Sequence, residues 1–65
     1  MAKVSNRIKE VLAEKGKTQV WLADKLGLEF VTVSRYANNH RQPSMERLAE
    51  IAKALGVKIK DLIND

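Results

Sequence analysis

The sequence predicts an all-α protein, a bundle of five short helices. Apolar residues recur at three- and four-residue spacing along most of the chain, which is the period of an amphipathic helix. Strand propensity competes with helix only in the segment "FVTV", and no alternation of β-branched residues is long enough for a sheet. Glycine and asparagine at turn positions divide the chain into five helical segments.

The first two predicted helices lie between Ser5 and Gly27. Ser5 is a good N-cap for the first helix, and Gly16 is the kind of residue that follows a helix C-terminus. Thr18 caps a short second helix, which Gly27 ends in a left-handed conformation that strains any residue with a Cβ. The apolar residues that we expect here in the core are Ile8, Val11, Leu12, Leu22, Ala23 and Leu26.

The third predicted helix runs from Glu29 to Asn38–Asn39, and its two sides differ in chemistry. At 100° per residue, the core side carries Val33, Tyr36 and Ala37. The opposite side carries Val31, Ser34, Arg35 and Asn38, with Phe30 at its edge. A purely solvated face would carry Glu and Lys. This side instead combines apolar groups with an arginine, a hydroxyl and an amide, which indicates a surface that binds a partner.

A loop, "NNHRQP", leads to a fourth helix that Ser44 caps and Gly56 ends. Its expected core residues are Met45, Leu48, Ala49, Ala52 and Leu55. The segment "VKIKDLIND" then predicts a short fifth helical turn with Val57, Ile59, Leu62 and Ile63 as apolar groups. Because these residues could exceed what a small core takes up, we expect a dimer surface at Val57 to Ile63.

The charge distribution points to a polyanionic partner. The formal net charge is +4 and the pI about 9.7. From Phe30 to Met45 there is no Asp or Glu, whereas Arg35, His40 and Arg41 all lie in this stretch. Positive potential is therefore expected around the third helix and the loop after it.

Composition and motifs exclude several functional classes. Without cysteine and with a single histidine, the chain has neither disulfides nor the ligands of a zinc site. No nucleotide-binding motif, nucleophile pair or catalytic carboxylate pair is visible, so we expect no enzyme, no cofactor and no metal. No segment is long and apolar enough to span a bilayer and no signal peptide is visible. We expect a single cytoplasmic domain over residues 1–65 that does not contact membranes.

One partner that suits the outward side of the third helix is duplex DNA. The major groove admits an α-helix, arginine can donate two hydrogen bonds to guanine, and apolar groups can meet the thymine methyl. Amide and cationic groups at the end of the helix suit phosphates.

The stretch "TQVWLADKLGLEFVTVSRYANNHRQPSMERLAEIAKALGVKIKDLI" resembles the phage repressor and Cro type of helix-turn-helix protein, also known as the XRE family. The similarity covers nearly the whole chain, from "RIKEVLAEKG" to "DLI". It implies a five-helix bundle of the repressor-like helix-turn-helix type whose third helix enters the major groove. We therefore expect a sequence-specific regulator of transcription that binds double-stranded DNA. Because a single small module makes few base contacts, we expect it to bind a palindromic operator as a homodimer.

The resemblance assigns roles to eight positions. Phe30, Val31, Ser34 and Arg35 would face base edges. Gln19 would hold a phosphate and brace the reading helix, and Asn38, Asn39 and Arg41 would contact other phosphates. The chain departs from the family pattern at Glu29, where Ser or Thr is usual, and at Asn39, where glycine is usual.

A further departure leaves a second function open. Val20 and Trp21 stand where polar residues are common in the family, and with Phe30 and Val31 they could form an exposed apolar cluster. The alternative is a protein-interaction or antitoxin-like module that uses the same scaffold. For Trp21 itself we expect a cation–π contact with Lys17 or Lys25, each four residues away.

Overall fold

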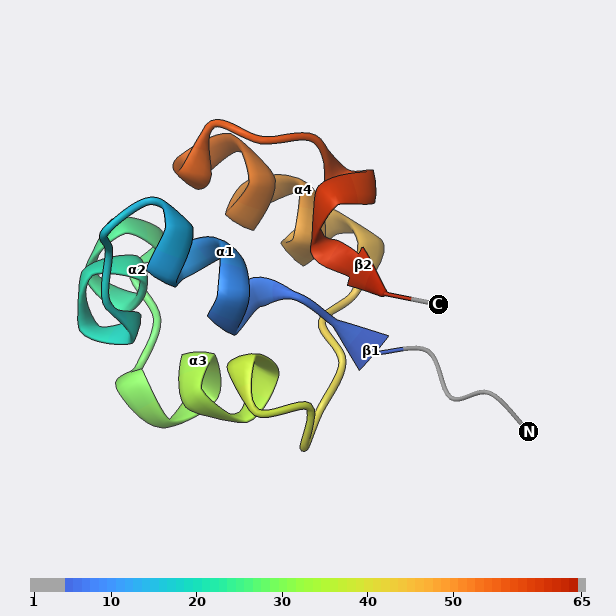
Figure 1. The fold of residues 1–65 in the computed structure, drawn as a ribbon. Helices are drawn as coiled ribbons and strands as arrows, with labels where there is room; N and C mark the ends of the chain where they lie inside the picture. Colours follow the sequence, from blue (N-terminus) through green and yellow to red (C-terminus); the bar gives the residue numbers. More distant parts are fainter. Residues whose placement is uncertain (1–4, 65) are drawn as a thin grey trace.

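The computed structural model describes residues 5–64 of the chain. In order, these residues form β1 (Ser5–Asn6), α1 (Ile8–Glu14), α2 (Gln19–Leu26), α3 (Phe30–Ala37), α4 (Met45–Leu55), the 3-10 helix η1 (Ile59–Leu62) and β2 (Ile63–Asn64). Helix α2 adjoins both α3 and α4, α4 also contacts η1, and α1 contacts α3 and η1 (Figure 1). The predicted helical class is therefore confirmed.

The prediction of five α-helices is wrong in its last member. The segment after Gly56 forms a four-residue 3-10 helix, in which the Asp61 side chain accepts a hydrogen bond from the backbone of Lys58 at 3.1 Å. Such tight helices rarely extend beyond a few residues. At Ile63 the backbone is extended and the chain continues as a strand.

That strand belongs to a small sheet that the sequence analysis missed. β1 and β2 pair antiparallel, with Ser5 opposite Asn64 and Asn6 opposite Ile63 (Figure 1). A pair of two-residue strands is too short to produce a recognisable alternation of apolar and polar residues. Ser5 accordingly lies in a strand and is not an N-cap. The N-cap position of α1 is Arg7, whose side chain makes no capping bond; Asn6, one residue earlier, accepts at Oδ1 from the Ile8 amide at 3.1 Å.

The other predicted helix ends are confirmed. Thr18 Oγ1 accepts from the Trp21 amide at 3.0 Å, and Ser44 Oγ accepts from the Arg47 amide at 3.1 Å. Gly27 takes a left-handed φ of 68°, and Asn39 takes a φ of 60°. The side-chain and backbone signals at these positions are local, so the sequence could specify them without knowledge of the fold.

The core forms where the apolar stripes of the helices meet. Its buried hydrophobic residues are Ile8, Val11, Leu12, Leu22, Ala23, Val33, Tyr36, Ala37, Leu48, Ile51, Ala52, Leu55 and Leu62. Met45 and Ala49, which we expected in the core, are exposed, Met45 to 64%. The buried stripe of α4 begins one turn after Met45 and uses Ile51 in place of Ala49.

Asn6 is the one buried polar residue among those described, with 4% of its surface exposed. Its side-chain Nδ2 donates to the Tyr36 carbonyl at 2.7 Å, in the last turn of α3, and to Gln42 Oε1 at 3.1 Å. Its backbone amide donates to Asn39 Oδ1 at 2.8 Å, and Gln42 Nε2 donates to the same oxygen at 3.0 Å. We call these three residues, Asn6, Asn39 and Gln42, the amide clamp. The clamp joins the N-terminal strand to the C-terminal end of α3.

We predict that Asn6→Ala lowers the free energy of unfolding by about 1–3 kcal/mol, because it leaves buried hydrogen-bonding groups without partners. Urea denaturation followed by circular dichroism measures this loss. Asn38→Ala is the matched control: Asn38 is exposed, and its side chain donates to Ser34, one turn earlier in the same helix. We expect a change of about 0.5 kcal/mol or less there. Equal losses in the two variants would contradict the structural role of the clamp.

Candidate nucleic-acid interface

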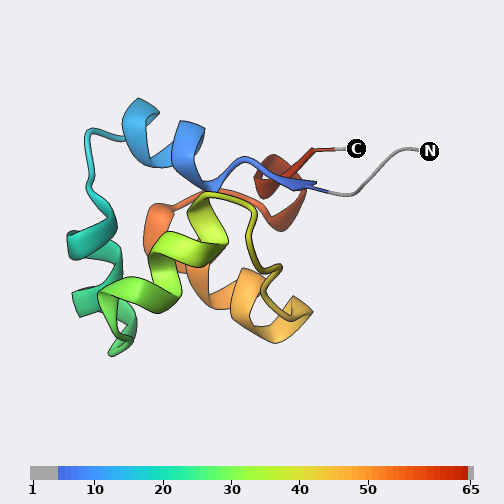
Figure 2. The ribbon, with the colours of Figure 1, turned by 90° about the horizontal axis from the view of Figure 1, so that it is seen from below.

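Helices α2 and α3 form a helix-turn-helix unit. The turn between them is tight, because Gly27 is left-handed and the Leu28 amide donates back to the Ala23 carbonyl at 2.9 Å. Leu28 is half-buried and packs against the core, which anchors the turn. Seen from below, α3 crosses the near side of the molecule next to α2 (Figure 2). The unit thus presents α3 at the surface.

The two sides of α3 divide as the helical period predicts. Val33, Tyr36 and Ala37 are buried. Phe30 and Val31 are 52% and 53% exposed, Arg35 is exposed, and Ser34 is half-buried. The helix thus holds its position through one face and leaves the opposite face accessible. The four predicted base-reading residues all lie outside the buried set.

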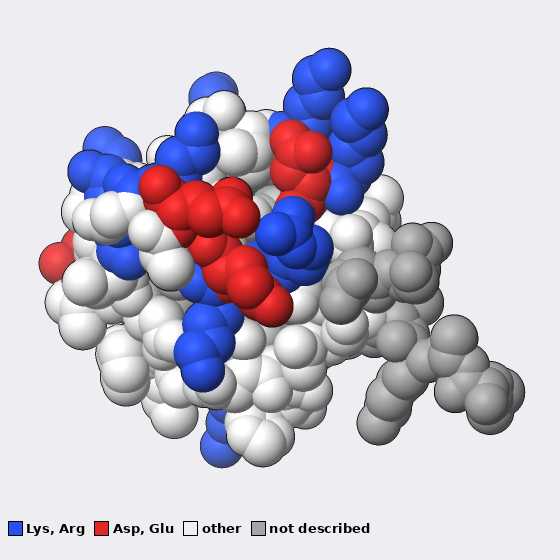
Figure 3. Space-filling model, viewed as in Figure 1, with Lys and Arg blue, Asp and Glu red and all other residues white. Residues whose placement is uncertain are grey.

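Carboxylates are absent from α3 itself and from the loop that follows it. Figure 3 shows acidic side chains gathered in a band over α1, which carries Glu10 and Glu14, while the part of this face over α3 is uncharged or basic. Glu29, directly before α3, is the nearest acid; it is exposed, and its side chain caps no backbone amide. The surface of α3 therefore suits a negatively charged partner.

The four predicted phosphate contacts differ in how free their side chains are. Gln19 is half-buried at the first position of α2, and Arg41 is exposed in the loop. Asn38 donates from Nδ2 to the carbonyl and hydroxyl of Ser34, at 2.9 and 3.2 Å. Asn39 is held in the amide clamp. A phosphate accepts hydrogen bonds and would contact the Nδ2 group of either asparagine. Asn38 Nδ2 would have to exchange its bonds to Ser34, whereas Asn39 Nδ2 makes a single internal contact, to the Asn6 carbonyl at 3.5 Å.

The clamp contains two positioning residues that the sequence analysis did not identify. Neither Asn6 nor Gln42 was predicted to have a structural role, and Gln42 was noted only as part of the loop "NNHRQP". The structure places the Gln42 amide between Asn6 and Asn39, where it braces the loop. A buried asparagine next to a short strand has no local sequence signature, because its partners lie more than thirty residues away.

Trp21 does not belong to an exposed apolar cluster. Its ring is half-buried against the core, and Lys17 Nζ lies 4.9 Å from the ring centroid, with Lys25 Nζ at 6.0 Å. The predicted cation–π contact is confirmed. The apolar groups that remain exposed near the helix-turn-helix unit are Val20, Phe30 and Val31.

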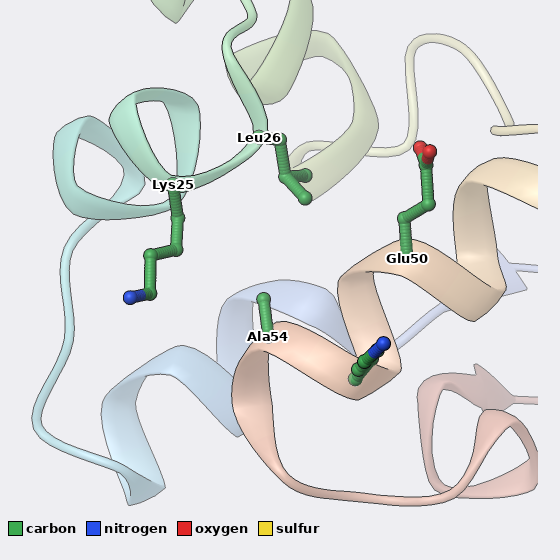
Figure 4. Close-up of a pocket in the computed structure, with 5 residues that line it drawn as sticks. Lys25, Leu26, Glu50 and Ala54 are labelled. Atoms are coloured by element: carbon green, nitrogen blue, oxygen red, sulfur yellow. The ribbon is translucent and has the colours of Figure 1, made fainter.

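A separate hollow of about 380 Å³ lies between α2 and α4, away from the outward side of α3 (Figure 4). It is lined by Lys25, Leu26, Glu50, Lys53 and Ala54. The Lys25 and Glu50 side chains point in different directions (Figure 4), so the charged groups do not converge on a common point. The lining therefore contains no arrangement for acid–base or nucleophilic chemistry.

Within residues 5–64, no group of three or more histidine, aspartate or glutamate side chains is placed to hold a metal ion. Nor does any helix there have the length and apolar character to cross a membrane.

Comparison with known proteins agrees with this geometry. Residues 8–62 match the family described as helix-turn-helix. The chain is 37% identical over 60 residues to the cryptic phage CTXphi transcriptional repressor RstR of Vibrio cholerae, a match that covers 86% of this chain and 54% of the repressor. The chain thus spans about half the length of that relative.

A solved structure is also similar along almost the whole chain. It is the crystal structure of a candidate DNA-binding protein from Bacteroides fragilis, with a TM-score of 0.93 and 45% sequence identity. The similarity covers 95% of this chain and 100% of that one. Since the family match takes in every helix described here, the chain belongs to the helix-turn-helix family of the phage repressor and Cro type.

Proposed function

We propose that this chain is a transcriptional regulator that binds double-stranded DNA sequence-specifically, with α3 in the major groove. The observation that carries the proposal is the outward side of α3, which is exposed, free of carboxylates and held by a buried opposite side. Family membership and the similarity to a phage repressor support it and indicate a DNA-binding regulator and not an enzyme.

The base-reading set comprises Phe30, Val31, Ser34 and Arg35. Arg35 has the geometry to donate two hydrogen bonds to guanine O6 and N7, and it is not engaged in an ion pair within residues 5–64. Ser34 offers a hydroxyl, and the two apolar residues lie in the first turn. Together they provide both donors and apolar surface for base edges.

The phosphate-contacting set comprises Gln19, Asn38, Asn39 and Arg41. Arg41 contributes a full charge from the loop, and Gln19 lies at the N-terminus of α2, where the helix dipole favours an anion. Asn38 and Asn39 border the same loop. Contacts of this kind fix the register of the protein on DNA but do not read its sequence.

A single small module makes few base contacts, so we further propose that it binds a palindromic operator as a homodimer. Half-sites about 10 bp apart would place two α3 helices in successive major grooves. The dimer surface at Val57 to Ile63 stays a prediction: Leu62 is buried, whereas Val57, Ile59 and Ile63 are partly buried against the core and leave part of their surface accessible.

Arg35→Ala should weaken binding to the preferred site by about 1–3 kcal/mol, or roughly 5- to 150-fold, and relax preference at one base position. Arg41→Ala, which removes a phosphate contact, should weaken binding to all sequences alike. Selection from random duplex DNA defines the site, and fluorescence anisotropy with the variants measures both effects. Unchanged affinity of Arg35→Ala for the selected site would refute the readout assignment.

The competing function is a protein-interaction or antitoxin-like module, and the exposure of Val20, Phe30 and Val31 favours it. Salt distinguishes the two. Binding to duplex DNA through several phosphates should weaken with a log–log slope of about −0.9 per contact, whereas a hydrophobic protein interface responds far less. Titrations of the selected duplex at increasing potassium chloride give the slope. A slope near zero would favour the protein interface.

We expect two chains per palindromic duplex and one chain on a duplex with a single half-site. Sedimentation velocity of the complexes measures the stoichiometry. The control is a duplex whose half-sites are moved apart by about half a helical turn, which should remove joint binding because the two grooves then face opposite sides. One chain on the intact palindrome would contradict the homodimer.

A further inference from the structure

We propose that Phe30 and Val31 read the C5-methyl groups of thymine, and that each half-site carries a guanine about two base steps from a thymine that Val31 contacts. The inference rests on the proposed function, since it concerns how α3 discriminates between bases. It assigns to these two residues a specific ligand chemistry, a methyl group on the edge of a pyrimidine.

The starting observation is the unusual exposure of these two side chains. Phe30 and Val31 occupy the first two positions of α3, and each leaves more than half of its surface exposed. Valine is also a poor helix former compared with the Glu or Lys that a solvated position would favour. Neither residue is needed by the core, which α3 fills with three other side chains. Adjacent exposed apolar groups on a small protein indicate a binding surface.

Helix geometry relates this apolar pair to Arg35. Val31 and Arg35 are four residues apart and both exposed, so they lie on the same stripe with a rise of about 6 Å between them. Successive bases along a strand are about 3.4 Å apart. A helix lying along the groove therefore aims the valine methyls and the guanidinium at positions about two base steps apart.

The charges around the pair identify nucleic acid as the occupant. An apolar patch that binds protein would be expected to have a polar rim of mixed sign, but no acid occurs from Phe30 to Met45, and Arg35 and Arg41 lie within that range. The nearest acid along the chain is Glu29, and a carboxylate in the major groove can accept from cytosine N4. Among base edges, only thymine presents a methyl group to apolar side chains in this groove.

The test replaces each thymine of the selected operator, one at a time, by deoxyuridine, which lacks only the C5 methyl. At the contacted positions we expect about four-fold weaker binding per methyl, the change that corresponds to loss of one buried methylene-sized group. A duplex that carries 5-methylcytosine paired with guanine at these positions should bind more tightly than the same duplex with unmodified cytosine. Fluorescence anisotropy at fixed salt measures each affinity.

Protein variants assign the effect to the two side chains. In Val31→Ala and Phe30→Ala, the thymine and deoxyuridine duplexes should bind with nearly equal affinity at the position that the replaced residue reads. Met45→Ala is the matched control, because Met45 is also exposed and apolar but lies on α4. It should keep the full penalty. Melting curves followed by circular dichroism establish that all three variants remain folded.

Several outcomes would overturn the inference. They are a selected site without thymine near its guanine, equal binding of the thymine and deoxyuridine duplexes, or a penalty that persists in both α3 variants. Self-association of the DNA-free protein at micromolar concentration that Val31→Asp abolishes would instead assign the patch to a second copy. If binding is sequence-selective but equally tight with thymine and deoxyuridine, the inference fails and the proposed function stands. Equal affinity for all duplexes refutes the proposed function itself.

Discussion

The position of α3 depends on a polar interaction between segments that are far apart in the chain. Asn6 donates from its side-chain amide to the end of α3 and to the loop after it, and its Oδ1 accepts from the first amide of α1. A buried amide is stable only if its hydrogen-bonding groups have partners. Any movement of the α3 terminus away from β1 would therefore leave donors and acceptors unpaired in the interior. This makes the clamp more restrictive than apolar contact alone, which tolerates sliding.

A second constraint on α3 comes from the small size of the domain. A chain of 65 residues buries a limited core, and the apolar side of a two-turn helix offers only three side chains to it. The clamp and the Gly27 turn fix the two ends of the helix instead. With both ends held, the outward side can carry residues chosen for recognition and not for stability. The exposed valine and phenylalanine in its first turn fit this division.

The sequence could predict the features that depend on local chemistry. The caps at Thr18 and Ser44 and the left-handed residues Gly27 and Asn39 follow from the intrinsic preferences of those side chains, and the two faces of α3 follow from helical period. It could not predict β1–β2 or the burial of Asn6, because β2 lies far along the chain from β1 and the groups to which Asn6 donates hydrogen bonds are 30 or more residues away. The exposure of Met45 was missed for a related reason. The helical period predicts which residues share a face of α4, but it does not predict which turns of that face are covered by other helices.

The clamp also changes how the loop after α3 can act. Asn39 was assigned to a phosphate through its family position, yet its side chain holds the N-terminal strand, and its left-handed backbone reverses the chain. The loop therefore offers Arg41 as its free charged group, on a backbone that the clamp holds in place. In this loop, side chains that hold the fold thus alternate with the side chain that we propose for binding. A substitution in this loop that disturbs the clamp would move Arg41 and the end of α3 together, so that in the proposed complex the contacts with phosphates and those with bases would be lost together.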